Sequence, residues 1–80
     1  MRIYNADSGK KVNKVILYLT PDEAKELQSS LEAILRDSKK HHHEHVPDSE
    51  YKREITVYIY NDDNLSSFDE RSRQLILNDE

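Results

Sequence analysis

Alternation of apolar and polar residues predicts the strands of this chain. Residues 53–60 read REITVYIY, and their apolar side chains fall on every second position, as on one face of a strand. Residues 14–20 (KVILYLT) are rich in β-branched and aromatic side chains, and residues 2–5 (RIYN) form a shorter run before them. The turn-forming residues at 7–10 lie between these two runs and predict a first hairpin.

The clearest helix signal begins at Thr20. This residue can cap a helix, Pro21 suits the first helical position, and Glu23 can reach back as in a capping box. Basic side chains follow at residues 36–40, so we expect the helix to end between residues 37 and 40. Apolar residues at helical spacing form one stripe along it: Ala24, Leu27, Leu31, Ile34 and Leu35.

Two further segments allow two interpretations each. Residues 41–46 (HHHEHV) stop before Pro47 and favour an edge strand paired with residues 53–60, with a frayed extension of the helix as the alternative. Residues 67–78 follow a helical spacing behind a possible capping box at Ser67, although QLIL at 74–77 is also compatible with a strand. We expect a short helix there.

Together these elements predict an α+β fold. A small antiparallel sheet, built in the order ββαββ, carries one long amphipathic helix on one face, and a short helix follows at the C-terminus. We expect residues 1–80 to form a single domain, because no repeat or linker divides the chain. A domain of this size buries only roughly 60 to 65% of its unfolded surface. The chain has no cysteine, so packing or self-association must supply its stability.

The distribution of charge along the chain limits the classes of possible binding partner. The formal net charge is −4, and residues 41–80 carry four basic and ten acidic side chains. This balance argues against nucleic acid and anionic membranes, which attract clustered Lys and Arg. The N-terminal sequence lacks the apolar run of a secretory signal, and no apolar stretch approaches the ~20 residues that cross a bilayer. We therefore expect a cytoplasmic protein.

Parity along the predicted strands separates two faces of the sheet. The odd-numbered apolar residues are expected to face the first helix: Ile3, Val15, Leu17, Leu19, Ile55, Val57 and Ile59. The even positions place a tyrosine-rich set on the opposite face: Tyr4, Ile16, Tyr18, Tyr58 and Tyr60. Either the C-terminal helix covers this face with Leu75 and Ile76, or the face stays open as an interface, most simply that of a homodimer.

A histidine cluster offers a second candidate site. Imidazole and carboxylate groups are ligands for Zn, Ni or Cu, and the candidate ligands are His41, His43, His45 and Glu44. On a strand, His43 shares a face with either neighbour two residues away, and Glu54 or Glu50 on the opposing strand would add a further ligand. The alternative is a solvated edge strand that is merely rich in histidine.

These observations favour a non-enzymatic interaction or regulatory module that self-associates through its tyrosine-rich face or binds another protein. Gly9 is the only glycine, so a glycine-rich phosphate cradle is excluded, and we assign no catalytic residue and no cofactor. The alternative is a protein that binds Zn or another divalent transition metal, or a small metal-dependent enzyme, that uses residues 41–45.

Overall fold

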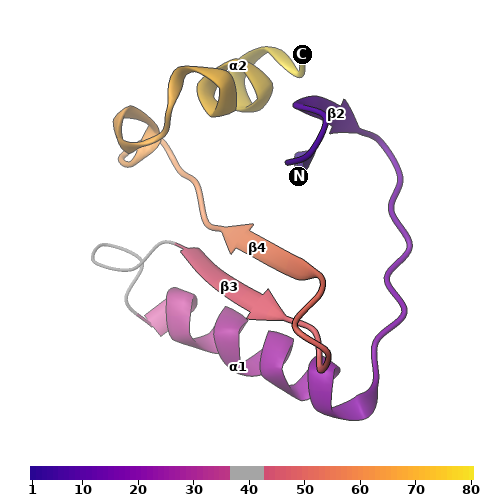
Figure 1. The fold of residues 1–80 in the computed structure, drawn as a ribbon. Coiled ribbons are helices and arrows are strands. Elements are labelled where there is room, and N and C mark those ends of the chain that lie inside the picture. The colour runs from indigo at the N-terminus through magenta and orange to yellow at the C-terminus, as the bar shows by residue number, and fades with distance from the viewer. Residues whose placement is uncertain (37–42) are drawn as a thin grey trace. The chain divides into compact units, whose positions relative to one another are not determined.

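The computed structural model describes residues 1–36 and 43–80 and shows an α+β chain. The predicted order ββαββ, followed by a C-terminal helix, is confirmed (Figure 1). The elements are β1 (Ile3–Asn5), β2 (Lys10–Val12), α1 (Pro21–Arg36), β3 (His43–Pro47), β4 (Glu54–Tyr58), the 3₁₀ turn η1 (Leu65–Ser67) and α2 (Glu70–Asn78).

The chain divides into two compact units. Residues 18–61 form the helix–hairpin unit, which contains α1, β3 and β4. Residues 1–17 and 62–80 form the terminal unit, which contains β1, β2, η1 and α2. Each unit has its own small core and is described by itself below. The expectation of a single domain stays a prediction.

The predicted capping box opens α1. The Thr20 backbone N–H donates to Glu23 Oε1 at 2.9 Å, and the Glu23 backbone N–H donates to Thr20 Oγ1 at 3.2 Å. Two N–H groups that would otherwise lack a partner at the helix start are thereby satisfied. The predicted end of this helix, at residues 37–40, lies outside the described residues.

The β3–β4 hairpin confirms the edge-strand interpretation for residues 43–46. The strands are antiparallel, and the register pairs His43 with Tyr58 and Val46 with Ile55. Asp48 organises the connecting loop, because its backbone N–H donates to Arg53 O at 2.9 Å and its Oδ1 accepts from Lys52 N–H at 2.8 Å. Residues 41 and 42 lie outside the described part of the chain.

Helix α1 packs against the hairpin through only part of its apolar stripe (Figure 1). Ile34 is fully buried, Val46 on β3 is 4% exposed, and Leu27 is half-buried. The remaining members of the stripe are exposed and form an apolar flank: Ala24, Leu31 and Leu35. A two-stranded hairpin is too narrow to cover a stripe this wide.

The first hairpin is shorter than the sequence predicts. Asn5 Oδ1 accepts the backbone N–H groups of Asp7 and Ser8, and Gly9 takes a left-handed conformation with φ of 72°. This tight turn starts the returning strand at Lys10 and pairs Ile3 with Val12.

The prediction of a strand over residues 14–20 is therefore wrong. The three residues of β1 are already paired with Lys10–Val12, so β1 cannot also pair with residues 14–20, which adopt no helix or strand. Within the described residues the strands form two separate two-stranded sheets. The parity argument for one shared sheet face consequently does not apply to residues 14–20.

The predicted C-terminal helix is confirmed as α2, and the strand alternative at 74–77 is wrong. Its N-cap is Asp69, two residues after the expected start at Ser67, which instead ends η1. Leu75 is buried in the terminal unit together with Phe68, which precedes the helix. Basic side chains from the first hairpin satisfy carbonyls near the helix end: Arg2 Nε donates to Leu75 O at 2.9 Å and Lys11 Nζ to Asp79 O at 2.8 Å.

Candidate functional site

One face of the β3–β4 hairpin gathers the described histidines. His43 and His45 are two residues apart on β3, and the register places Tyr58 and Thr56 opposite them on β4. Because side chains alternate along a strand, Val46 and Glu44 belong to the other face, and the burial of Val46 marks that face as the one toward α1. We call the first set, with Glu54, the histidine face.

Ring contacts order the histidine face. The His43 ring stacks on Tyr58, with centroids 4.9 Å apart and an interplanar angle of 19°. His45 meets the His43 ring edge to face, at 5.3 Å and 86°. Offset stacks and edge-to-face pairs of this kind are the favoured geometries of aromatic rings. They orient both imidazoles on this face of the hairpin.

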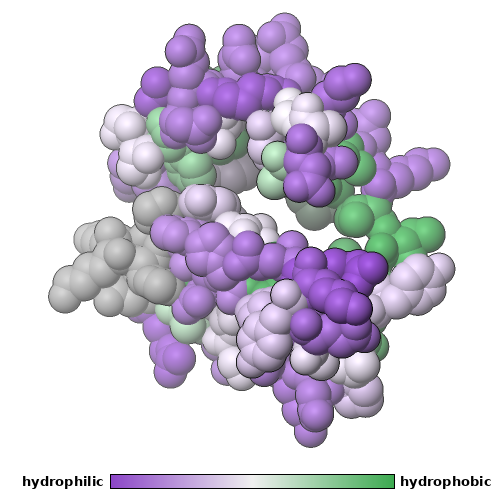
Figure 2. Space-filling model, in the orientation of Figure 1, coloured by the Kyte–Doolittle hydropathy of each residue, from purple (hydrophilic) through white to green (hydrophobic). Residues whose placement is uncertain are grey.

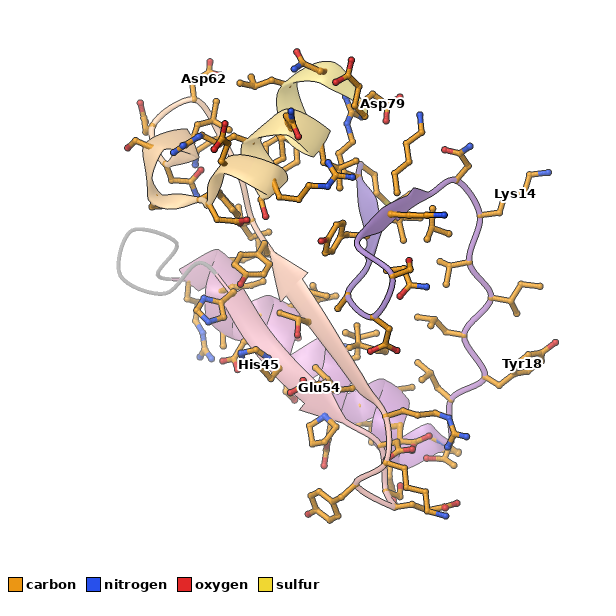
Figure 3. The ribbon with its side chains drawn as sticks, turned by 45° about the horizontal axis from the view of Figure 1, so that its top comes forward. Lys14, Tyr18, His45, Glu54, Asp62 and Asp79 are labelled. Carbon is orange, nitrogen blue, oxygen red and sulfur yellow. The ribbon has the colours of Figure 1, made fainter. Side chains whose placement is uncertain are left out.

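His45 makes two polar contacts with residues of β4 on this face. Its Nδ1 lies 2.9 Å from Thr56 Oγ1 and 3.2 Å from Glu54 Oε1. A carboxylate only accepts hydrogen bonds, so Glu54 Oε1 can accept one from Nδ1 in the tautomer that carries the proton there. Figure 3 shows His45 and Glu54 side by side on the two strands. The acidic neighbour that the sequence proposed from the opposing strand is therefore present.

The proposed metal ligands are only partly brought together. His43, His45 and Glu54 share one face, Glu44 belongs to the other, and His41 lies outside the described residues. Within residues 1–36 and 43–80, no group of three His, Cys, Asp or Glu side chains has a geometry that could hold a metal ion. The metal site stays a prediction.

The predicted tyrosine-rich set is distributed over both units. Tyr4 and Ile16 belong to the terminal unit, whereas Tyr18, Tyr58 and Tyr60 belong to the helix–hairpin unit. All five side chains are exposed. Tyr4 already has a neighbour in its own unit, because the Arg71 guanidinium lies 5.4 Å from the centre of its ring.

The most exposed apolar segment of the described structure is one that the sequence predicted to be a strand of the first hairpin. Residues 15–19 read VILYL, and their side chains range from 38% exposed at Leu19 to 90% at Tyr18. We call them the apolar run. In Figure 2 hydrophobic surface marks the place of the segment that joins β2 to α1 in Figure 1, and in Figure 3 Tyr18 projects outward from it.

Local electrostatics hold the start of α1 against the hairpin loop. Backbone N–H groups of Thr20 and Ser49 that donate to Glu23 lower the pKa of this carboxyl below its ordinary value of 4.5. The backbone N–H of Lys52 does the same for Asp48, with Arg53 adding to the effect. Both carboxylates therefore serve the local structure in their charged form.

Two small pockets lie among the described residues. A pocket of about 140 Å³ lies in the terminal unit beside Arg2 and Lys11, and one of about 60 Å³ lies beside Glu23 and Asp48 in the helix–hairpin unit. Pockets that hold ligands usually begin at roughly 300 Å³. Neither helix among the described residues is long and apolar enough to cross a membrane.

Comparison with known proteins adds no relative from which a function could be transferred. No protein-family model, curated protein sequence or solved structure matches this chain.

Proposed function

We propose that this protein is a non-enzymatic interaction module that self-associates through the apolar run. The observation that carries this proposal is the exposure of five consecutive apolar side chains, each at least 38% exposed, in a segment without secondary structure. Contiguous exposed apolar surface is uncommon on soluble proteins and marks interaction sites. Tyrosine, here Tyr18, is enriched at the buried centres of such sites.

The small size of the two cores favours a second copy of the same chain as the partner. Among the described residues four apolar side chains are buried, two in each unit: Ile34 and Val46, and Phe68 and Leu75. Units of this length normally need a disulfide, a metal or association to become stable, and the chain has no cysteine. Association with a second copy supplies that stability without another component.

The apolar flank of α1 (Ala24, Leu31 and Leu35) adds to the surface that association would cover. Leu35 is 68% exposed, although it belongs to the stripe expected to be buried. Burial of apolar area contributes roughly 25 cal/mol per Å². Covering both the run and the flank would therefore add to the stability of the folded chain.

A dilution series in the analytical ultracentrifuge tests the proposal. We expect the wild-type chain to sediment as a dimer at micromolar concentration, and the double variant Ile16→Ser/Tyr18→Ser to weaken the dimer by more than about tenfold, as loss of central aromatic contacts does. The matched control is Leu77→Ser on α2, which removes another exposed apolar side chain, 63% exposed, and should leave the dimer unchanged. A wild-type monomer, or equal effects of both variants, would contradict the proposal.

A further inference from the structure

We infer that the apolar flank of α1 packs against the same flank in a second copy, with the two helices antiparallel about a two-fold axis. This inference rests on the proposed self-association and adds to it a second contact surface and an orientation. The hairpin lies along one side of α1, where Ile34 is fully buried (Figure 1). On the flank, Leu31 and Leu35 are 38% and 68% exposed. Apolar side chains in a row along a helix form the usual contact surface for another helix.

The spacing of the flank is that of a coiled-coil seam. Four exposed positions of α1 follow one another at intervals of four, three and four residues: Ala24, Gln28, Leu31 and Leu35. These intervals are those of the d and a positions of a heptad repeat, at which the side chains of two helices interlock. The seam is only about three turns long, so we expect it to act together with the apolar run.

The two borders of this seam differ in character. The heptad places Leu27 and Ile34 at the g positions, and these side chains are half-buried and buried in the helix–hairpin unit. It places Lys25 and Glu32 at the e positions of the opposite border, where both are exposed. Neither makes an ion pair with another side chain in the described part of the chain. Two opposite charges on the e border are therefore available to a partner.

These charges select the antiparallel direction. In an antiparallel pair, a positions face d positions, so Ala24 lies opposite Leu35 of the second copy, and the two e borders face each other. Lys25 of each copy then comes beside Glu32 of the other, and the two-fold axis repeats the contact. In a parallel pair each e border would face a g border instead. Both charges would then meet apolar positions and the hairpin that covers them, without an opposite charge from the other helix.

The same register suits the sizes and polarity of the seam residues. Small Ala24 faces large Leu35 at both ends of the seam, which lets the two helices approach closely. The two-fold axis passes between residues 29 and 30, so Gln28 of each copy lies beside it, where the two amides can exchange hydrogen bonds. The positive end of each helix dipole also lies beside the negative end of the other.

Cross-linking tests the direction of the helices, because the natural chain contains no cysteine. A chain with Ala24→Cys is mixed with an isotopically labelled chain that carries Leu35→Cys, and a short thiol-to-thiol cross-linker is added. Antiparallel pairing brings positions 24 and 35 together and separates the two copies of either position by about 16 Å along the axis. The inference predicts several-fold more mixed product than random collision gives. An excess of the same-residue products would show a parallel pair and overturn the inference.

Two charge variants test whether the e borders face each other. Lys25→Glu makes the border wholly acidic and Glu32→Lys makes it wholly basic, so each variant repels its own copy and attracts the other. In an equimolar mixture with one variant isotopically labelled, native mass spectrometry should show the mixed dimer at least about threefold above a random distribution. Each variant carries the same change in the mixed and in the self-paired dimer, so an effect on folding cannot produce this preference. A random distribution would contradict the facing borders.

Gln28 provides a gain-of-affinity test. Gln28→Leu should tighten the dimer about three- to tenfold, because a polar residue at a seam position lowers the stability of paired helices. The matched control is Gln74→Leu at an exposed position of α2, which should leave the dimer unchanged. No tightening, or equal tightening by both variants, would contradict a seam at this position.

The outcomes separate this inference from the proposed function. A dimer that Ile16→Ser/Tyr18→Ser weakens, but that gives no excess of the mixed cross-link, overturns the helix pairing and leaves self-association through the apolar run standing. A dimer that gives the mixed cross-link and is unaffected by that double variant overturns the run as the interface and leaves the helix pairing standing. A monomer under all conditions overturns both.

Discussion

Glu23 Oε2 accepts the backbone N–H of Ser49 at 2.8 Å, across 26 residues of sequence. The same carboxylate accepts the Thr20 backbone N–H through its other oxygen, Oε1. One side chain therefore caps α1 and ties the start of the helix to the β3–β4 loop. A local capping motif thus also carries a tertiary contact of the helix–hairpin unit.

Replacing Glu23 by Gln should destabilise the helix–hairpin unit, because an amide has one acceptor oxygen and cannot serve both Thr20 and Ser49. We expect a lower urea midpoint, followed by far-UV circular dichroism, than for the control Glu26→Gln one helical turn away. Thr20→Ala, which removes the other half of the capping box, should cost about 1 kcal/mol. Equal midpoints for the two Glu→Gln variants would contradict the dual role of Glu23.

Stability should decrease on acidification. The pKa values of Glu23 and Asp48 lie below their ordinary values of 4.5 and 3.8 in the folded chain, because backbone N–H groups donate to both carboxylates. A lowered folded-state pKa contributes stability that is complete above the unfolded-state pKa and is lost as the pH falls through the folded value. The contribution of these two groups to the urea midpoint should therefore be constant from pH 7 to about 5 and should decrease below about pH 4.

The variant Glu23→Gln provides the control for this pH dependence. It cannot titrate at position 23, so its midpoint should fall less steeply below pH 4 than that of the wild-type chain. Identical slopes for the two proteins would show that the Glu23 contacts contribute nothing to acid sensitivity.

The core of the terminal unit depends on Leu75. Leu75→Ala should cost about 2 to 4 kcal/mol, because it leaves a cavity in a core with few buried side chains. Leu77→Ala, two residues away on the same helix and 63% exposed, should change the unfolding free energy by less than about 0.5 kcal/mol. Amide signals of α2, followed during urea unfolding, report the unfolding free energies of both variants. Similar losses of unfolding free energy in the two variants would contradict the assignment of Leu75 to the core.

Zinc should be held weakly by the wild-type chain. The described residues provide no group of three ligands, whereas structural zinc sites use four. We expect one equivalent of Zn²⁺ to be lost on desalting and to be absent from the native mass spectrum. Retention of one ion by the wild-type chain and its loss in His43→Ala would instead establish the metal-binding alternative.

Several features of the fold were predictable because their causes are local. Thr20, Pro21 and Glu23 lie within one turn, so the start of α1 follows from capping chemistry alone. The strict alternation at residues 54–58 was sufficient to predict β4, and the break at Pro47 favoured an edge strand before it over an extension of the helix. The contact between His45 and Glu54 follows from strand pairing in the same way.

Tertiary structure alone decided which apolar residues are covered. Residues 14–20 have the composition of a strand, but strand formation needs a neighbour to complete the backbone hydrogen bonds, and β1 ends after three residues. Leu31 and Leu35 match the helical stripe, yet the narrow hairpin leaves both exposed. Sequence by itself determined the local geometry of caps, turns and alternation, because those interactions span only a few residues. The partners of each surface were decided by long-range packing, because burial depends on what other elements lie within reach.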